Sequence, residues 1–240
     1  SELSKQEQAL FGAALGFVSG YVNVICCIRY NAFGTLMTGN LLQMVKTYFE
    51  HGLRVEKGSG ALLPLPVFYG LVICARNLGL LAHHLVAKRS AIGVAPLMAP
   101  FQAVSMFIAE LSTRVPERWH VWLVAFGFGV QSQVSWPALG LPTMMVTGHM
   151  SNIFNTTMQV ILGDAPRQDL GSIIVPAVVT CAKVFGAISG ASAHRRLRGK
   201  SSKRPHPFLL TPISVVQAVL LVLIERRAPI ERNSYRRAPE

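Results

Sequence analysis

Two cations stand in the middle of long apolar segments of this sequence. Arg76 and Lys183 each follow a Cys-Ala pair and each precede a glycine by three residues, in segments that otherwise hold no charge. A cation at the centre of a bilayer costs about 2.5–3.5 kcal/mol on insertion scales, so such a residue is expected to face the protein interior or a water-filled path. The chemistry that two such cations offer is the binding of a negatively charged group.

Two short tripeptides offer the same chemistry through the backbone. They are Thr-Gly-Asn at 38–40 and Thr-Gly-His at 147–149, and a glycine inside a helix costs about 1 kcal/mol relative to alanine. If a helix begins at each glycine, its free N–H groups and the positive end of its dipole favour an anion. Together with the cations, the predicted ligands or caps for a small anion are Thr38, Gly39, Asn40, Thr147, Gly148 and His149.

A polar stripe follows the second tripeptide. Asn152, Asn155, Thr156 and Gln159 recur at spacings of three and four residues, which places them on one side of a helix. Because this polarity is unfavourable in contact with lipid, we expect the stripe to face the interior of the bundle.

A structural interpretation stands beside the anion site. Arg76 and Lys183 can instead donate to backbone carbonyls or reach lipid phosphate by snorkelling, and the glycines of the tripeptides can simply let helices pack closely. Both interpretations stay open at the level of sequence.

Composition predicts the elements that position these residues. The chain has 240 residues, 51% hydrophobic and 14% charged, against about 25% charged in soluble domains, and its mean hydropathy is +0.40. Windows of about 18–20 residues without charge fit helices that cross a bilayer, so we expect an all-α, multi-pass integral membrane protein in a membrane that the sequence does not specify. The predicted helices are Leu10–Arg29, Phe33–Phe49, Leu62–Ala87, Pro96–Leu111, Val121–Pro137, Pro142–Leu162, Ile173–Ala193 and Pro207–Ile224.

An internal repeat organises these helices. The tripeptides align, the Cys-Ala-cation blocks align, and Gln102-Ala103-Val104 before Glu110 aligns with Gln217-Ala218-Val219 before Glu225. We therefore predict two membrane repeats, at 10–112 and 119–225, between a polar segment at 1–9 and a basic tail at 226–240. Six to eight helices are expected to be embedded in the membrane. The nearly balanced loop charges leave open a parallel eight-span or an inverted six-span arrangement, of which the inverted one is typical of transporters.

The net charge of +12 comes from basic residues that gather in short loops and in the tail. This distribution favours contact with anionic lipid headgroups and argues against a nucleic-acid partner. The cysteines and histidines lack the spacing of a metal site, so we expect no metal and no cofactor. Motifs for a catalytic nucleophile, a phosphate loop or paired catalytic carboxylates are also missing from the sequence, so an enzyme is not expected.

Several motifs together resemble one family. They are Gly16–Asn23 (GFVSGYVN), Met37–Asn40 (MTGN), Phe126–Gln131 (FGFGVQ) and Val146–Gly148 (VTG). The chain, from about Leu10 to Ile224, resembles the YoaK family of small multi-spanning membrane proteins of undefined function (domain of unknown function 1275). The resemblance implies the fold and a membrane location but no substrate. The family usually has Asp after Gly-Tyr-Val, where this chain has Asn23, so proton coupling through that position is not expected.

Two functions remain as hypotheses. The first is a transporter-like protein with a site for a small anion near the middle of the membrane. The second is a non-catalytic accessory subunit that packs against a larger membrane complex. The arginine-rich tail favours the second, because such a tail becomes ordered only when a partner holds it.

Overall fold

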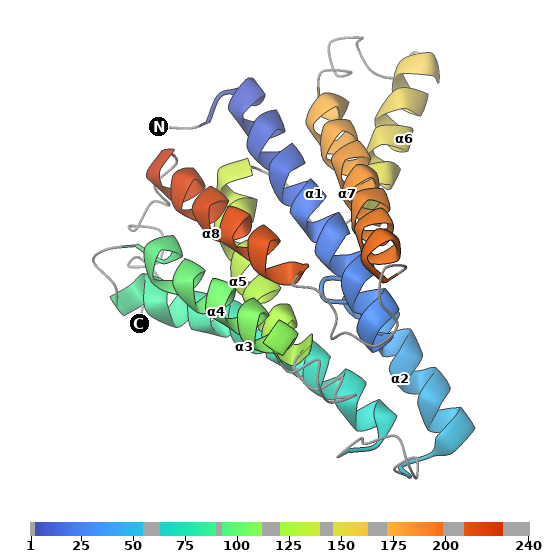
Figure 1. Ribbon diagram of the computed structural model, residues 1–240. Coiled ribbons are helices and arrows are strands. Elements are labelled where there is room, and N and C mark those ends of the chain that lie inside the picture. Colours follow the sequence, from blue (N-terminus) through green and yellow to red (C-terminus); the bar gives the residue numbers. More distant parts are fainter. Residues whose placement is uncertain are drawn as a thin grey trace, which may run out of the picture.

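The computed structural model describes residues 3–54, 63–89, 93–111, 121–139, 146–162, 172–198 and 209–227. Within these ranges the regular elements are helices, without a β-strand, so the all-α prediction is confirmed. Each predicted helix is found, with ends shifted by a few residues. The helices are α1 (Lys5–Tyr30), α2 (Met37–His51), α3 (Leu65–Arg89), α4 (Ala95–Leu111), α5 (Val121–Leu139), α6 (Val146–Leu162), α7 (Ile174–Arg198) and α8 (Leu210–Arg227) (Figure 1).

Three of these helices are long and apolar enough to cross a membrane. They are α1, α3 and α7, the last over residues Ile174–Arg196. Their apolar surface agrees with the predicted association with a membrane.

Helices α1 and α7 make the most extensive contact in the bundle, and glycines allow their backbones to meet. A Cβ atom at Gly20 would overlap the carbonyl oxygen of Lys183, and one at Gly186 would overlap that of Phe17. Small residues of this kind let two helices approach within van der Waals distance of their main chains. Both positions therefore need glycine for the observed packing.

Helices α3 and α5 pack in the same manner. A Cβ atom at Gly129 would overlap the carbonyl oxygen of Arg76, and one at Gly79 would overlap that of Phe126. These four residues are the ones that the repeat alignment places on Gly20, Lys183, Gly186 and Phe17. The two contacts are thus built from corresponding positions of the chain.

The directions of the helices follow from which residues meet. Gly12 faces Val179 and Gly190 faces Tyr21, so the residue numbers rise together and α1 runs parallel to α7. In contrast, Ile25 in the second half of α1 clusters with Val121 at the start of α5, whereas Leu15 in the first half clusters with Val134 farther along α5. Helices α1 and α5 are therefore antiparallel, with buried apolar side chains between them.

Helices α4 and α8 pack against one another, and each places a carboxylate at the start of the other (Figure 1). Glu225, near the end of α8, accepts hydrogen bonds from the N–H groups of Val94 and Ala95 at 2.8 and 2.5 Å. Glu110, near the end of α4, accepts from the N–H groups of Leu210 and Thr211 at 2.6 and 2.8 Å. Carboxylates are favourable at helix N-termini, where N–H groups have no partner within the helix. The reciprocal caps hold α4 and α8 antiparallel.

Glu110 has further partners that Glu225 does not share. Its carboxylate also accepts from the N–H of Leu209 and from the hydroxyl of Thr211, and it pairs with Arg29 of α1 at 3.2 Å. Both side chains of this ion pair are almost fully buried. Glu110 therefore connects the end of α1 to the α4–α8 pair.

The glycine contacts predict a strong effect of one methyl group. Gly20→Ala and Gly129→Ala should each lower the free energy of unfolding by about 1–3 kcal/mol, because backbone atoms must move to admit the Cβ atom. Thermal unfolding in detergent measures this as a lower Tm. Gly70→Ala is the matched control, since its Cβ atom would lie 3.7 Å from the sulfur of Met44, an ordinary contact. Equal stability of all three variants would contradict the packing described.

The carboxylate caps predict unequal losses. Glu110→Gln should lower Tm more than Glu225→Gln, because the first change leaves Arg29 buried without its countercharge, and breaking a buried pair costs about 3–5 kcal/mol. The double variant Arg29→Met, Glu110→Gln should regain part of the loss. The ranking is wrong if Glu225→Gln is the more damaging change in the same unfolding assay.

Candidate functional site

The connection from α1 to α2 turns back along α1. Asn31 ends α1 with a left-handed backbone (φ 50°), and the N–H of Thr35 donates to Oδ1 of Asn23 at 3.1 Å. Asn23 lies seven residues before the end of α1, which is about 10 Å along a helix axis at 1.5 Å per residue. Helix α2 therefore begins beside the body of α1, well before the level at which α1 ends.

Asn40 holds this connection in place. Its Oδ1 accepts from the N–H of Phe33 at 2.9 Å, and its Nδ2 donates to the carbonyl of Phe33 at 2.7 Å. The ring of Phe33 lies against Gly39, where a Cβ atom would come within 2.6 Å of the ring. Gly39 and Asn40 thus fix the start of α2. Both polar atoms of the Asn40 side chain form hydrogen bonds to the backbone of Phe33.

Helix α2 starts close to the predicted position, but its N-cap residue is not one of the residues predicted for that role. The helix begins at Met37, and its N-cap residue, Leu36, makes no side-chain hydrogen bond. The prediction of Thr38 or Asn40 as a cap is therefore wrong, because the first turn already contains them. Thr38 is exposed, and the first N–H groups of α2 have no side-chain cap.

Arg76 lies at the level of this helix start. Helix α2 packs on α3, and its end lies at the start of α3 as the two run antiparallel (Figure 1). Met44 faces Gly70 in this pair, so Thr38, six residues earlier, is level with Arg76, six residues later. Arg76 is half-buried, and its Nε is a buried atom without a hydrogen-bond partner in the described part of the chain.

In the second half of the chain, α6 packs on α7 as α2 packs on α3. Helix α6 begins at Val146, and α7 carries Lys183 as α3 carries Arg76. His149 and Lys183 are buried, with 4% and 6% of their surface exposed. Thr147, Gly148 and Asn152 were also predicted for the site or the stripe. The surroundings of these three residues lie outside what the structure describes.

The two cations occupy separate places in the bundle. Helix α7 packs on α1, α1 packs on α5, and α5 packs on α3, so two helices stand between the carriers of Lys183 and Arg76. Arg76 thus lies on the helix that packs on α2 and Lys183 on the helix that packs on α6, and the two cations do not share one site in the described structure.

The polar stripe of α6 does not face the interior of this chain. Asn155 and Gln159 are exposed and Thr156 is half-buried. Helix α6 packs chiefly on α7, so most of its circumference has no neighbouring helix in the described structure. The inward orientation predicted for Asn155 and Gln159 is therefore corrected: spacing placed these residues on one face, but another face of α6 meets α7.

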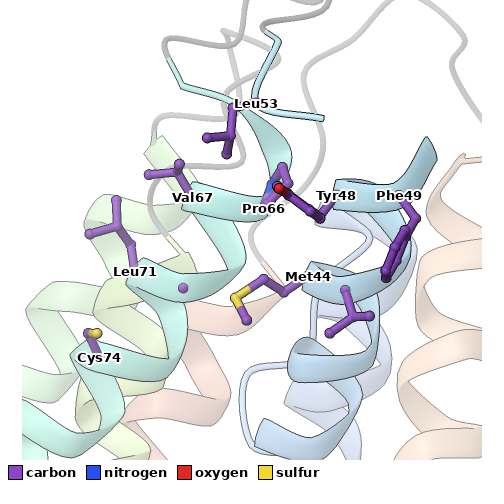
Figure 2. A pocket seen from close by; sticks show the side chains of 10 residues that line it. Met44, Tyr48, Phe49, Leu53, Pro66, Val67, Leu71 and Cys74 are labelled. Atoms are coloured by element: carbon purple, nitrogen blue, oxygen red, sulfur yellow. The ribbon is translucent and has the colours of Figure 1, made fainter. Parts of the chain in front are cut away.

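An open groove lies between α2 and α3. Its volume is about 630 Å³, and its lining is apolar, with Met44 reaching from α2 toward α3 (Figure 2). Cys74 and Leu71 form one wall, and Tyr48 and Phe49 the other. The apolar lining of this groove suits a hydrocarbon chain, and none of its lining residues carries a charge that could bind an anion.

Sequence reasoning missed three buried glutamines. Gln102, Gln131 and Gln217 are at most 1% exposed, and none was predicted as a site residue. A signal was present, because Gln102 and Gln217 occupy corresponding repeat positions within charge-free windows. An uncharged amide in an apolar segment is as unusual a feature as a cation, although its insertion cost is lower.

The comparison with known proteins gives one family. A family described as "Protein of unknown function (DUF1275)" matches residues 11–220, which is most of the chain. No curated protein and no solved structure matches the sequence.

The Asn40 contacts predict a local effect. Asn40→Leu should accelerate amide hydrogen exchange across residues 31–40, because both hydrogen bonds to Phe33 are lost and the connection is released from α2. Hydrogen–deuterium exchange in detergent, read by mass spectrometry, measures this. Thr38→Val is the matched control, since Thr38 is exposed, and its exchange should stay close to that of the native protein. Equal acceleration in both variants would contradict the role assigned to Asn40.

Proposed function

Because this chain belongs to the DUF1275 family, whose description names no function, we propose from its geometry that it is a small, transporter-like, multi-pass integral membrane protein that binds a small anion. The observation that carries the proposal is the opposed orientation of corresponding helices. The proposal includes no catalytic step.

Opposed orientation supports an inverted repeat. Helix α1 runs antiparallel to α5 and α4 runs antiparallel to α8, although the sequence aligns each pair. The contact of α1 with α7 corresponds to that of α5 with α3. A two-fold axis in the plane of the membrane relates elements in this way, and many secondary transporters are built so. In this proposal α2 and α6 are half-helices that begin within the membrane, which leaves six full spans.

Two half-sites for an anion follow from the same proposal. One combines the uncapped start of α2 with Arg76, whose Nε has no partner in the described structure, and the other combines the start of α6 with Lys183. Helix starts attract negative charge, and interrupted helices carry such starts into the bilayer in other transporters. Arg76 is the sharper candidate, because it lies level with the first turn of α2.

Anion-dependent stability tests the proposal. Sodium sulfate, nitrate and phosphate should each be compared with sodium chloride at equal ionic strength. At least one of them should raise Tm by several degrees, because a ligand at a concentration of 100 times its Kd stabilises the folded state by about 2.7 kcal/mol. Arg76→Ala should reduce the shift from the α2 half-site and Lys183→Ala that from the α6 half-site. Lys88→Ala, at the exposed end of α3, is the matched control and should keep the full shift.

Two results would count against the proposal. The first is that none of the anions shifts Tm, which is the result expected of a purely structural protein. The second is an equal shift in all variants, which would rule out the half-sites. Extraction from the native membrane in mild detergent tests the second hypothesis, that the protein is an accessory subunit of a larger complex. Co-migration with one large assembly would favour that subunit, whereas the size of a monomer or small homo-oligomer favours the transporter-like protein.

A further inference from the structure

Three buried glutamine side chains lie on α4, α5 and α8, which pack against one another. Gln217 of α8 donates from its Nε2 to Oε1 of Gln131 on α5. Gln102 of α4 packs against Gly127 of α5, where a Cβ atom would lie 2.7 Å from its Cγ. Gly127 and Gln131 are four residues apart and so share one face of α5. All three amides are at least 99% buried.

Most of the hydrogen-bonding capacity of this cluster is unused. Both amide atoms of Gln102, the Nε2 of Gln131 and the Oε1 of Gln217 have no hydrogen-bond partner among the described residues. A buried amide without partners costs free energy, whereas apolar side chains of the same size would not. The unused atoms include two donors and two acceptors. The cluster is therefore complementary to a molecule that both donates and accepts hydrogen bonds.

The cluster also lacks a formal charge. The carboxylates of Glu110 and Glu225 lie eight residues along the same helices, about 12 Å away at 1.5 Å per residue, and both are occupied by helix starts. Arg76 contacts α5 at Gly129 through its backbone carbonyl, and the cations of the half-sites are carried by α3 and α7, outside the three helices of the cluster. An ion here would lose its hydration without gaining a countercharge, so an uncharged ligand fits best.

A primary carboxamide matches this capacity. Its two N–H hydrogens and the two lone pairs of its carbonyl oxygen equal the two acceptors and two donors that are unpartnered among the described residues. A carboxamide group adds a planar donor and acceptor pair of the kind that glutamine side chains already form with each other. Such a group can pair with two glutamines at once.

We propose that Gln102, Gln131 and Gln217 bind a small uncharged carboxamide between α4, α5 and α8. The site uses other helices and other chemistry than the anion half-sites, so it does not rest on the proposed function. Its place between one helix of the first half and two of the second is the kind of position at which inverted-repeat proteins bind solutes.

The test uses the full chain in detergent and acetamide as the probe. Acetamide at millimolar concentration should raise Tm in a saturable manner. N,N-dimethylacetamide, which accepts hydrogen bonds but cannot donate them, should not. In Gln102→Met and Gln217→Met the apparent affinity for acetamide should fall at least tenfold. Gln159→Met makes the same chemical change on the exposed face of α6 and should leave the affinity unchanged.

Three outcomes would overturn the proposal. They are no saturable shift with acetamide, an equal shift with both amides, and full affinity in the two core variants. Higher stability of those variants without any response of the native protein would mean that the amides are unliganded or hydrated by water only. If the core variants do not fold, the comparison of the two amides on the native protein still decides the question. Loss of the anion response in Arg76→Ala with the acetamide response retained would separate the two proposals.

Discussion

The contact of backbone with backbone at four glycines sets the position of the other helices. At Gly20 and Gly186, and again at Gly79 and Gly129, a helix lies directly on the carbonyl groups of its neighbour. Two rigid pairs result, α1 with α7 and α3 with α5, and the antiparallel contact of α1 with α5 joins them. Helices α4 and α8 then pack along this core, while α2 and α6 attach to its outer helices.

The polar groups of the bundle follow from this frame. Several polar side chains bind backbone groups where helices start or end, as Glu110 and Glu225 do, whereas the buried glutamines lie in the middle of their helices. Asn23 and Asn40 both bind the backbone of the connection between α1 and α2. Asn23 stands where the family resemblance leads one to expect an aspartate, and as an amide it does this without titrating. The connection between α1 and α2 is therefore held by neutral hydrogen bonds.

Sequence reasoning reached the elements more easily than their partners. Charge-free windows located most of the described helices, because lipid and core both exclude charge. Helices α2 and α7 contain charged residues and were predicted as apolar elements of the two repeats. The repeat alignment also paired Gly20 with Gly129. It could not show that Gly20 meets Lys183, since a contact between elements more than a hundred residues apart leaves no local pattern. The same holds for Glu110. Its partner, the start of α8, lies about a hundred positions along the chain. Spacing placed Asn155 and Gln159 on one face of α6, but spacing does not say which face meets α7.

The ion pair of Arg29 with Glu110 makes the two ends of the α4–α8 contact energetically unequal. At the alignment offset of the tripeptides, the position that corresponds to Arg29 is Ala138, and Glu225 forms no ion pair with a described residue. Separating the helices at Glu225 breaks two hydrogen bonds to N–H groups, whereas at Glu110 it breaks three such bonds, one to a hydroxyl and an ion pair. The α4–α8 contact is therefore held more strongly at Glu110 than at Glu225, although each carboxylate caps the start of the opposite helix.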